Sequence, residues 1–231
     1  MSKVRFVCLA NSFKEGGRCL AGVVLDSNNV PIFDNGVIQW IRPISKSFHG
    51  KIDAALVENI NLLDILEIDV LEYPNLDSYQ SENAIFVEDS IQVIGKYDKN
   101  SLAAFYDSNN LIFGNKGKAI HPDNIASHKH SLMFIKTTDF EVFQKKYENN
   151  PNSKIRLRFT YKENLYDLPV TDPVFLKKYQ TNPDFMKDYN QMDLALSIGV
   201  EHEGWYNKLV VGIILSCIDN HNSTIIPLNK I

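Results

Sequence analysis

Three groups of cationic and aromatic side chains have the composition of a surface that contacts nucleic acid. The first combines the polar connection between two apolar runs, residues 11–17, with a third run that begins at Trp40. Cations neutralise phosphates, and a base stacked on an aromatic ring gains roughly 1 to 3 kcal/mol. The alternative is structural: Trp40 packs in the core and Arg42 pairs with an acid such as Glu82. The candidate contact residues of this group are Asn11, Ser12, Lys14, Arg18, Trp40 and Arg42.

The second group lies on one predicted strand. Residues 154–162, KIRLRFTYK, alternate with a period of two, which places the cations on one face and the apolar side chains on the other. An ordinary solvated strand face that protects a sheet edge explains the pattern equally well. The candidate contact residues are Lys154, Arg156, Arg158 and Lys162.

The third group lies in and after the loop of residues 201–207, EHEGWYN. Adjacent aromatic residues in a glycine-containing loop can stack bases, so Trp205 and Tyr206 are candidates together with Lys208. The alternative is that at least one of the two rings closes the end of a barrel.

Catalytic chemistry has weaker support in the sequence. His121, His128 and His130 lack the cysteine or paired carboxylates that would complete a metal site. Carboxylates at Asp64, Glu67 and Asp69 allow a cryptic metal-dependent nuclease as a third hypothesis, although alternating acids usually form the solvated face of a strand. The sequence therefore favours a non-catalytic protein, with no catalytic residue, metal ligand or cofactor predicted.

The elements that must position these groups follow the same order in both halves of the chain. The first half predicts strands over residues 4–10, 18–25, 37–44 and 63–71, and a fifth over residues 82–87 and 91–94 that is broken at residues 88–90. A helix is predicted within residues 53–63. The second half predicts strands over residues 131–136, 154–162, 165–170, 192–198 and 208–217. Its helices are predicted from Thr137 or Thr138 to Tyr147 and from Asp172 to about Tyr189, with Asp172 as N-cap.

Five strands with a helix between the third and fourth have the order of an OB fold, which binds oligonucleotides or oligosaccharides. We therefore predict a mainly β fold with α insertions, made of two tandem OB-like five-stranded barrels. The predicted domains are residues 1–125 and 126–231, and the second carries an additional helix after its first strand.

Composition limits the class of protein. The net charge of −4 means that nucleic-acid binding requires a local patch. The three cysteines, at positions 8, 19 and 217, lack metal or disulfide spacing and suggest buried, reduced thiols. The longest apolar run, residues 209–218, is about half the length that spans a bilayer, and the N-terminus does not match a signal peptide. We expect a cytoplasmic protein without a membrane partner.

Several short segments resemble one known family. They are CLANSFKEGGRCLAGVVL at residues 8–25, WIRPIS at 40–45, LLDILEI at 62–68, QSEN at 80–83, LPVTDPVF at 168–175, LALSIG at 194–199 and KLVVGII at 208–214. In this order they resemble the dual OB-containing domain family of prokaryotes. Departures are Phe13, where a basic or small residue is expected, and the insertion DSNNVPIFDNG at residues 26–36.

The resemblance implies two OB folds and nucleic-acid binding, often in systems of conflict between prokaryotes and their viruses. The leading hypothesis is a non-catalytic module for DNA or RNA in antiviral defence, with single strands favoured. The alternative is a regulatory or adaptor subunit that binds a protein from the same operon or a small nucleotide-like ligand.

Overall fold

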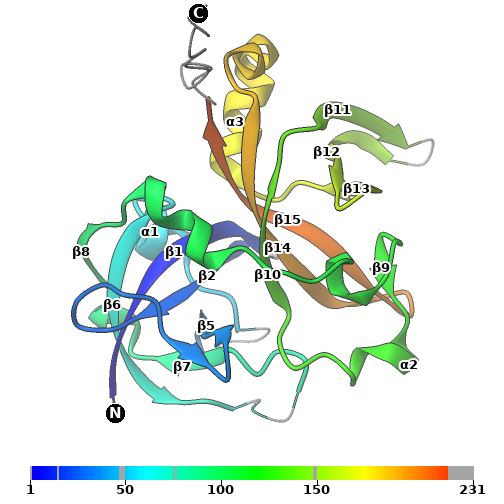
Figure 1. Cartoon of the computed structure of the whole chain (residues 1–231). Helices are drawn as coiled ribbons and strands as arrows, with labels where there is room; N and C mark the ends of the chain where they lie inside the picture. The colour runs from blue at the N-terminus through cyan, green and yellow to red at the C-terminus, as the bar shows by residue number, and fades with distance from the viewer. Residues whose placement is uncertain are drawn as a thin grey trace, which may run out of the picture.

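A closed barrel of five strands forms the first half of the chain (Figure 1). The computed structural model describes residues 2–14, 16–46, 50–74, 76, 78–147 and 150–217, without the side chains of residues 147 and 150–152. The barrel strands follow the order β1-β2-β5-β7-β6, and β6 pairs back onto β1. Strands β5 and β7 are parallel, as an OB fold requires. Their bounds are β1 (Ser2–Lys14), β2 (Gly17–Leu25), β5 (Trp40–Ile44), β6 (Asp64–Glu72) and β7 (Asn83–Phe86).

Short elements complete this barrel. Helix α1 (Ala54–Val57) separates the third and fourth strands, and the Asp53 side chain caps it by accepting from the backbone N–H of Ala55 at 3.0 Å. The predicted insertion, residues 26–36, contains β3 (Phe33–Asp34), which forms a hairpin with β4 (Val37–Ile38). Strand β8 (Gln92–Lys96) adds to the outside of β6. The 3-10 helices of the chain include η2 (Glu88–Ser90), η3 (Lys99–Phe105), η4 (Ile112–Gly114) and η5 (Pro183–Asp188).

The second half forms a curled, partly open barrel from two sheets, of order β10-β14-β15-β9 and β11-β12-β13. A parallel bridge between Val170 and Val210 connects the end of β13 to β15, which reproduces the parallel contact of an OB fold. Helix α3 (Pro173–Thr181) again separates the third and fourth strands. The remaining bounds are β9 (Ala119–Ile120), α2 (Pro122–Ile125), β10 (Leu132–Thr137), β11 (Phe140–Tyr147), β12 (Asn150–Tyr161), β13 (Asn164–Pro169), β14 (Gln191–His202) and β15 (Trp205–Ser216). Both predicted OB-like barrels are thus confirmed.

The helix predicted up to Tyr147 is wrong, because this segment is strand β11. Phe140 and Val142 pack against the core of the second barrel, and β11 pairs with β12 along its length. Thr137 does not cap a helix; its hydroxyl bonds to the backbone carbonyls of Asp139 at 3.1 Å and Thr160 at 2.9 Å. The first strand of the second barrel therefore bends and continues as β11, because burial of one face outweighs local helix propensity.

The two barrels share a hydrophobic core where they meet. One cluster of buried side chains combines Leu9, Ala21 and Trp40 of the first barrel with Phe134 and Val211 of the second. Each barrel also has a core of its own. Strand β9 pairs with β15, so residues 119–120 join the second unit, while a domain boundary between residues 125 and 126 stays a prediction. Among the described residues, no helix is long and apolar enough to cross a membrane.

The crossing of β1 and β15 brings the two backbones into direct contact at Gly212. A Cβ atom built on Gly212 would lie 2.0 Å from the carbonyl oxygen of Leu9 and 3.3 Å from the Cα atom of Ala10. Only glycine permits this approach without displacing one strand.

We predict that Gly212→Ala lowers the free energy of unfolding by about 3 kcal/mol, because the added methyl group separates the two barrels. Gly95→Ala is the matched control, since its Cβ atom would lie 3.7 Å from the Ile65 Cδ1 atom, an ordinary contact. Urea unfolding measures both. Equal stability of the two variants would contradict the close crossing.

Candidate nucleic-acid interface

The first predicted group lies largely inside the protein. Asn11 and Ser12 are only 7% and 3% exposed. The Asn11 side-chain amide donates to the carbonyl oxygens of Val57 and Ile60, each at 2.9 Å, and so fixes the end of α1 against β1. The Asn11 side chain thus holds the hairpin in place, and Asn11 and Ser12 are both buried.

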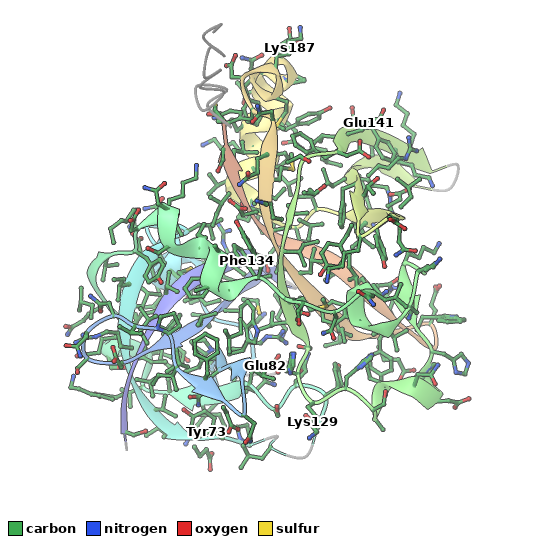
Figure 2. The ribbon with its side chains drawn as sticks, in the orientation of Figure 1. Tyr73, Glu82, Lys129, Phe134, Glu141 and Lys187 are labelled. Carbon is green, nitrogen blue, oxygen red and sulfur yellow. The ribbon has the colours of Figure 1, made fainter. Side chains whose placement is uncertain are left out.

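Arg42 is buried at the junction of the barrels. Its guanidinium forms an ion pair with Glu82 at 3.1 Å and donates to the hydroxyls of Ser131 at 2.7 Å and Ser197 at 3.1 Å. The Ser131 hydroxyl in turn donates to Glu82 at 2.5 Å. The Glu82 partner matches the structural alternative for Arg42, and Figure 2 shows Glu82 where the two barrels meet.

Lys14 and Arg18 lie at the tip of the first hairpin, partly exposed, apart from Arg42. The Arg18 guanidinium lies 4.9 Å from the ring centroid of Phe13, which is 57% exposed. The backbone N–H of Phe13 donates to the carbonyl of Thr171 at 3.0 Å, so the tip rests against the second barrel. The single groove expected for Asn11, Ser12, Lys14, Arg18 and Arg42 is therefore not formed.

We predict that Glu82→Gln lowers the free energy of unfolding by about 3 to 5 kcal/mol, because it leaves the buried Arg42 charge without its counter-ion. Asp184→Asn serves as control. It removes an ion pair to Lys187 at 2.8 Å whose side chains are both 75% exposed, which should cost less than about 1 kcal/mol. If chemical denaturation shows that the two variants lose similar free energies of unfolding, Arg42 does not depend on Glu82 as its counter-ion.

The second predicted group divides between buried and exposed positions on β12. Lys154 and Arg158 lie exposed on the outer face of the β11-β12-β13 sheet. Arg156 is 7% exposed, pairs with the Asp167 carboxylate, and donates to the Asp167 carbonyl at 2.6 Å. Lys162 follows the strand at a turn, and its ammonium donates to the carbonyl of Ser108.

Arg158 combines an exposed positive charge with an aromatic contact. Its guanidinium lies 4.8 Å from the ring centroid of Phe143 and pairs with Glu141 at 2.7 Å. The Arg158 and Glu141 side chains are 44% and 59% exposed, so this ion pair is weak and accessible to a competing phosphate. Figure 2 shows Glu141 on this outer sheet.

The third predicted group also divides between exposed and buried positions. Trp205 is 48% exposed and meets His121 edge to face, with 5.1 Å between ring centroids. Tyr206 is partly buried and packs edge to face on Tyr79 at 5.2 Å. Lys208 is fully buried.

Lys208 holds the segment after η4 against β15. Its ammonium donates to the carbonyl of Ile112 at 2.6 Å, and to the carbonyl and side-chain oxygens of Asn115 at 2.8 and 2.9 Å. Burial lowers the pKa of Lys208 to about 7 from its ordinary value of 10.5. The role of this lysine is structural in the described conformation.

We predict that wild-type stability rises between about pH 7 and pH 10 relative to that of Lys208→Met. In this window the unfolded chain retains a proton on Lys208 that the folded chain releases, so folding gains at most about 1.4 kcal/mol per pH unit. Urea unfolding of both proteins at about pH 7 and pH 9 isolates the contribution of Lys208. Parallel stability curves would contradict the lowered pKa.

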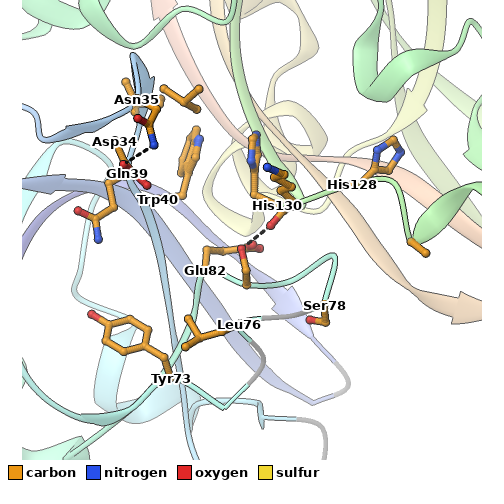
Figure 3. A pocket seen from close by; sticks show the side chains of 15 residues that line it. Asp34, Asn35, Gln39, Trp40, Tyr73, Leu76, Ser78, Glu82, His128 and His130 are labelled. Carbon is orange, nitrogen blue, oxygen red and sulfur yellow. Dashed lines mark hydrogen bonds between the residues drawn. The ribbon is translucent and has the colours of Figure 1, made fainter.

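A cleft of about 790 Å³ opens at the first barrel and was not predicted from the sequence (Figure 3). Its lining comes from the β3–β4 hairpin, the start of β5, the loop between β6 and β7, and the segment of residues 126–130. Trp40 is 7% exposed and packs mainly into the shared core, but it also borders this cleft. Tyr73 and Lys129 come from distant parts of the sequence, which is why no local pattern identified them.

The predicted nuclease carboxylates are engaged in ion pairs. Asp64 pairs with Lys96 at 2.7 Å, and Glu67 pairs with Lys3 at 3.0 Å. Within the described ranges, no three histidine, cysteine or acidic side chains are grouped to hold a metal ion.

A closed five-stranded barrel and a partly open one, each with a helix after its third strand, define a tandem OB-fold protein. The chain belongs to the dual OB-containing domain family, whose model matches residues 4–213. No curated protein matches the chain.

The chain is also similar, at low sequence identity, to several solved structures. A replication protein A heterotrimer bound to ssDNA shares 9% identity over 94% of this chain and 49% of that chain, with a TM-score of 0.40. This chain thus spans about half the length of that one. A murine DNA binding protein bound with ds DNA shares 9% identity over 94% and 98% of the two chains, with a TM-score of 0.34. The tetrameric p202 HIN2 shares 8% identity over 94% of this chain and 92% of that chain, with a TM-score of 0.30. These values are too low to support a function, which must be argued from this chain's own residues.

Proposed function

We propose that the protein binds single-stranded nucleic acid along the outer face of the β11-β12-β13 sheet. The observation that carries this proposal is the exposed Arg158 guanidinium stacked on Phe143, with Lys154 on the same face. These residues lie on β12, the second strand of an OB barrel, and strands two and three are where OB folds bind oligonucleotides.

The chemistry of this face suits a flexible strand. A guanidinium that rests on one aromatic ring can stack a nucleobase on its other side while it donates to phosphate. The Asp167 carboxylate neutralises the charge of the buried Arg156, so Lys154 and Arg158 supply the exposed positive charge of this face. Phosphate can replace the Glu141 carboxylate, because an exposed ion pair contributes only about 0 to 1 kcal/mol.

The proposal includes no catalytic step, and backbone charge and base stacking account for binding without sequence specificity. A cytoplasmic role in prokaryotic antiviral defence is part of the proposal, and its support is the family resemblance alone.

We predict that Lys154→Ala with Arg158→Ala weakens binding to all single-stranded sequences about tenfold at low salt. Two lost phosphate contacts should also reduce the slope of log affinity against log salt by roughly 1.4. Glu141→Gln should act in the opposite direction, because it removes the carboxylate that competes with phosphate for Arg158. Fluorescence anisotropy with labelled DNA and RNA oligonucleotides at several salt concentrations measures both effects.

Lys187→Ala is the matched control, since it removes one exposed cation on η5, outside this face. It should leave affinity and salt slope unchanged. The proposal would be overturned if the wild-type protein did not bind at low salt. It would also be overturned if Lys187→Ala lost as much affinity as the Lys154→Ala, Arg158→Ala variant.

A further inference from the structure

The cleft at the first barrel separates its polar groups into two sides. Figure 3 shows Asp34, Asn35 and Gln39 on one side and His128 and His130 on the other. The first side offers a carboxylate and two carboxamides, and therefore both donors and acceptors. The second side also includes Lys129, whose ammonium has no ion-pair partner within the described part of the chain.

Trp40 lies between these two sides, and Tyr73 and Leu76 line the part of the cleft that is at the bottom of the view (Figure 3). Trp40 and Tyr73 contribute rings, and Val37 and Leu76 are 51% and 67% exposed at the cleft. A ligand that matches this order has a flat apolar ring, a hydrogen-bonding edge and an anionic group. The volume of about 790 Å³ lies within the range of small-molecule sites.

The base of the cleft is held rigid by the junction of the barrels. Glu82 borders the cleft, but Arg42 neutralises its charge, so it does not repel an anion. The Ser81 hydroxyl donates to the backbone carbonyl of Lys129, which fixes the segment of residues 126–130 to the loop before β7. Asn35 donates to the Asp34 carboxylate at 3.0 Å. The parts of a site that such contacts hold in place lose little entropy when a ligand binds.

Lys129 contributes an ammonium group to the second side. Burial lowers the pKa of His128, with smaller contributions from His130 and Lys208, which favours its neutral form. The His128 ring packs beside Phe113, with 6.4 Å between ring centroids.

We propose that this cleft binds one nucleotide, with the base beside Trp40 and the phosphate at Lys129. Asp34, Asn35 and Gln39 contact the edge of the base. This site goes beyond the strand-binding face of the second barrel and does not depend on it. The phosphate can belong to a free nucleotide or to the 5′ end of a strand, which present the same chemistry.

The test uses Trp40 as the reporter. The chain contains two tryptophans, so Trp205→Phe leaves Trp40 as the sole emitter. Adenosine, cytidine, guanosine and uridine monophosphates are titrated into this full-length variant, and at least one should change the Trp40 emission with saturation. Adding Lys129→Ala should weaken binding of that nucleotide about tenfold and leave binding of its nucleoside unchanged.

Controls separate the possible outcomes. Lys116→Ala removes an exposed lysine that does not border the cleft and should have no effect. Asp34→Asn should change the preference among the four bases. A 5′-phosphorylated tetranucleotide that competes with the nucleotide identifies a strand end as ligand, and failure to compete identifies a free nucleotide; both support the site.

Unchanged emission up to about 5 mM of all four nucleotides, or equal affinity of the Lys129→Ala and parent proteins with equal melting temperatures, would overturn the inference. The Lys154→Ala, Arg158→Ala variant should keep full nucleotide affinity. A negative result for strand binding on the β11-β12-β13 sheet is therefore distinguishable from a negative result for nucleotide binding in the cleft.

Discussion

The buried ion pair between Arg42 and Glu82 is the interaction on which the joined architecture depends. Both residues belong to the first barrel, and both bond to Ser131 at the start of the second. Burial of two charges is favourable only when their remaining hydrogen bonds are satisfied, and the two serine hydroxyls from the second barrel satisfy part of this requirement. Separation of the two barrels would break these hydrogen bonds and expose the apolar side chains of the shared core to water.

This junction also determines which surfaces remain available for binding. Separate barrels would each present the outer face of their second and third strands. In this protein the face of the first barrel is partly covered, because Trp40 packs with Phe134 and Val211 in the shared core and β15 crosses β1 at Gly212. What remains open on the first barrel is a cleft beside the junction, while the corresponding sheet of the second barrel is exposed. The two barrels have similar topology but offer different kinds of site.

Charged residues in this fold have two distinct roles, and their spacing in the sequence does not distinguish these roles. Arg42, Arg156 and Lys208 are buried, and each bonds to defined oxygen atoms within the protein. Arg158 and Lys154 occupy the same strand as Arg156 but are exposed. The difference depends on neighbouring strands. Asp167 of β13 lies opposite Arg158 in the register but forms its ion pair with Arg156. Strand β11 supplies the accessible Glu141 and the Phe143 ring that contact Arg158.

The sequence by itself determined the family, the mainly β class and the OB order of both halves, because strand periodicity and turn residues are local properties. It also identified the cation-bearing face of β12 and the capping role of Asp172, which accepts from the backbone N–H groups of Val174 and Phe175. It did not identify β11 as a strand, since that choice depends on pairing with β12. Only the tertiary structure decided that Arg42 is an internal ion-pair partner and that Tyr73 and Lys129 border one cleft. Burial and long-range proximity arise from the packing of the two barrels, and no local pattern in the sequence encodes them.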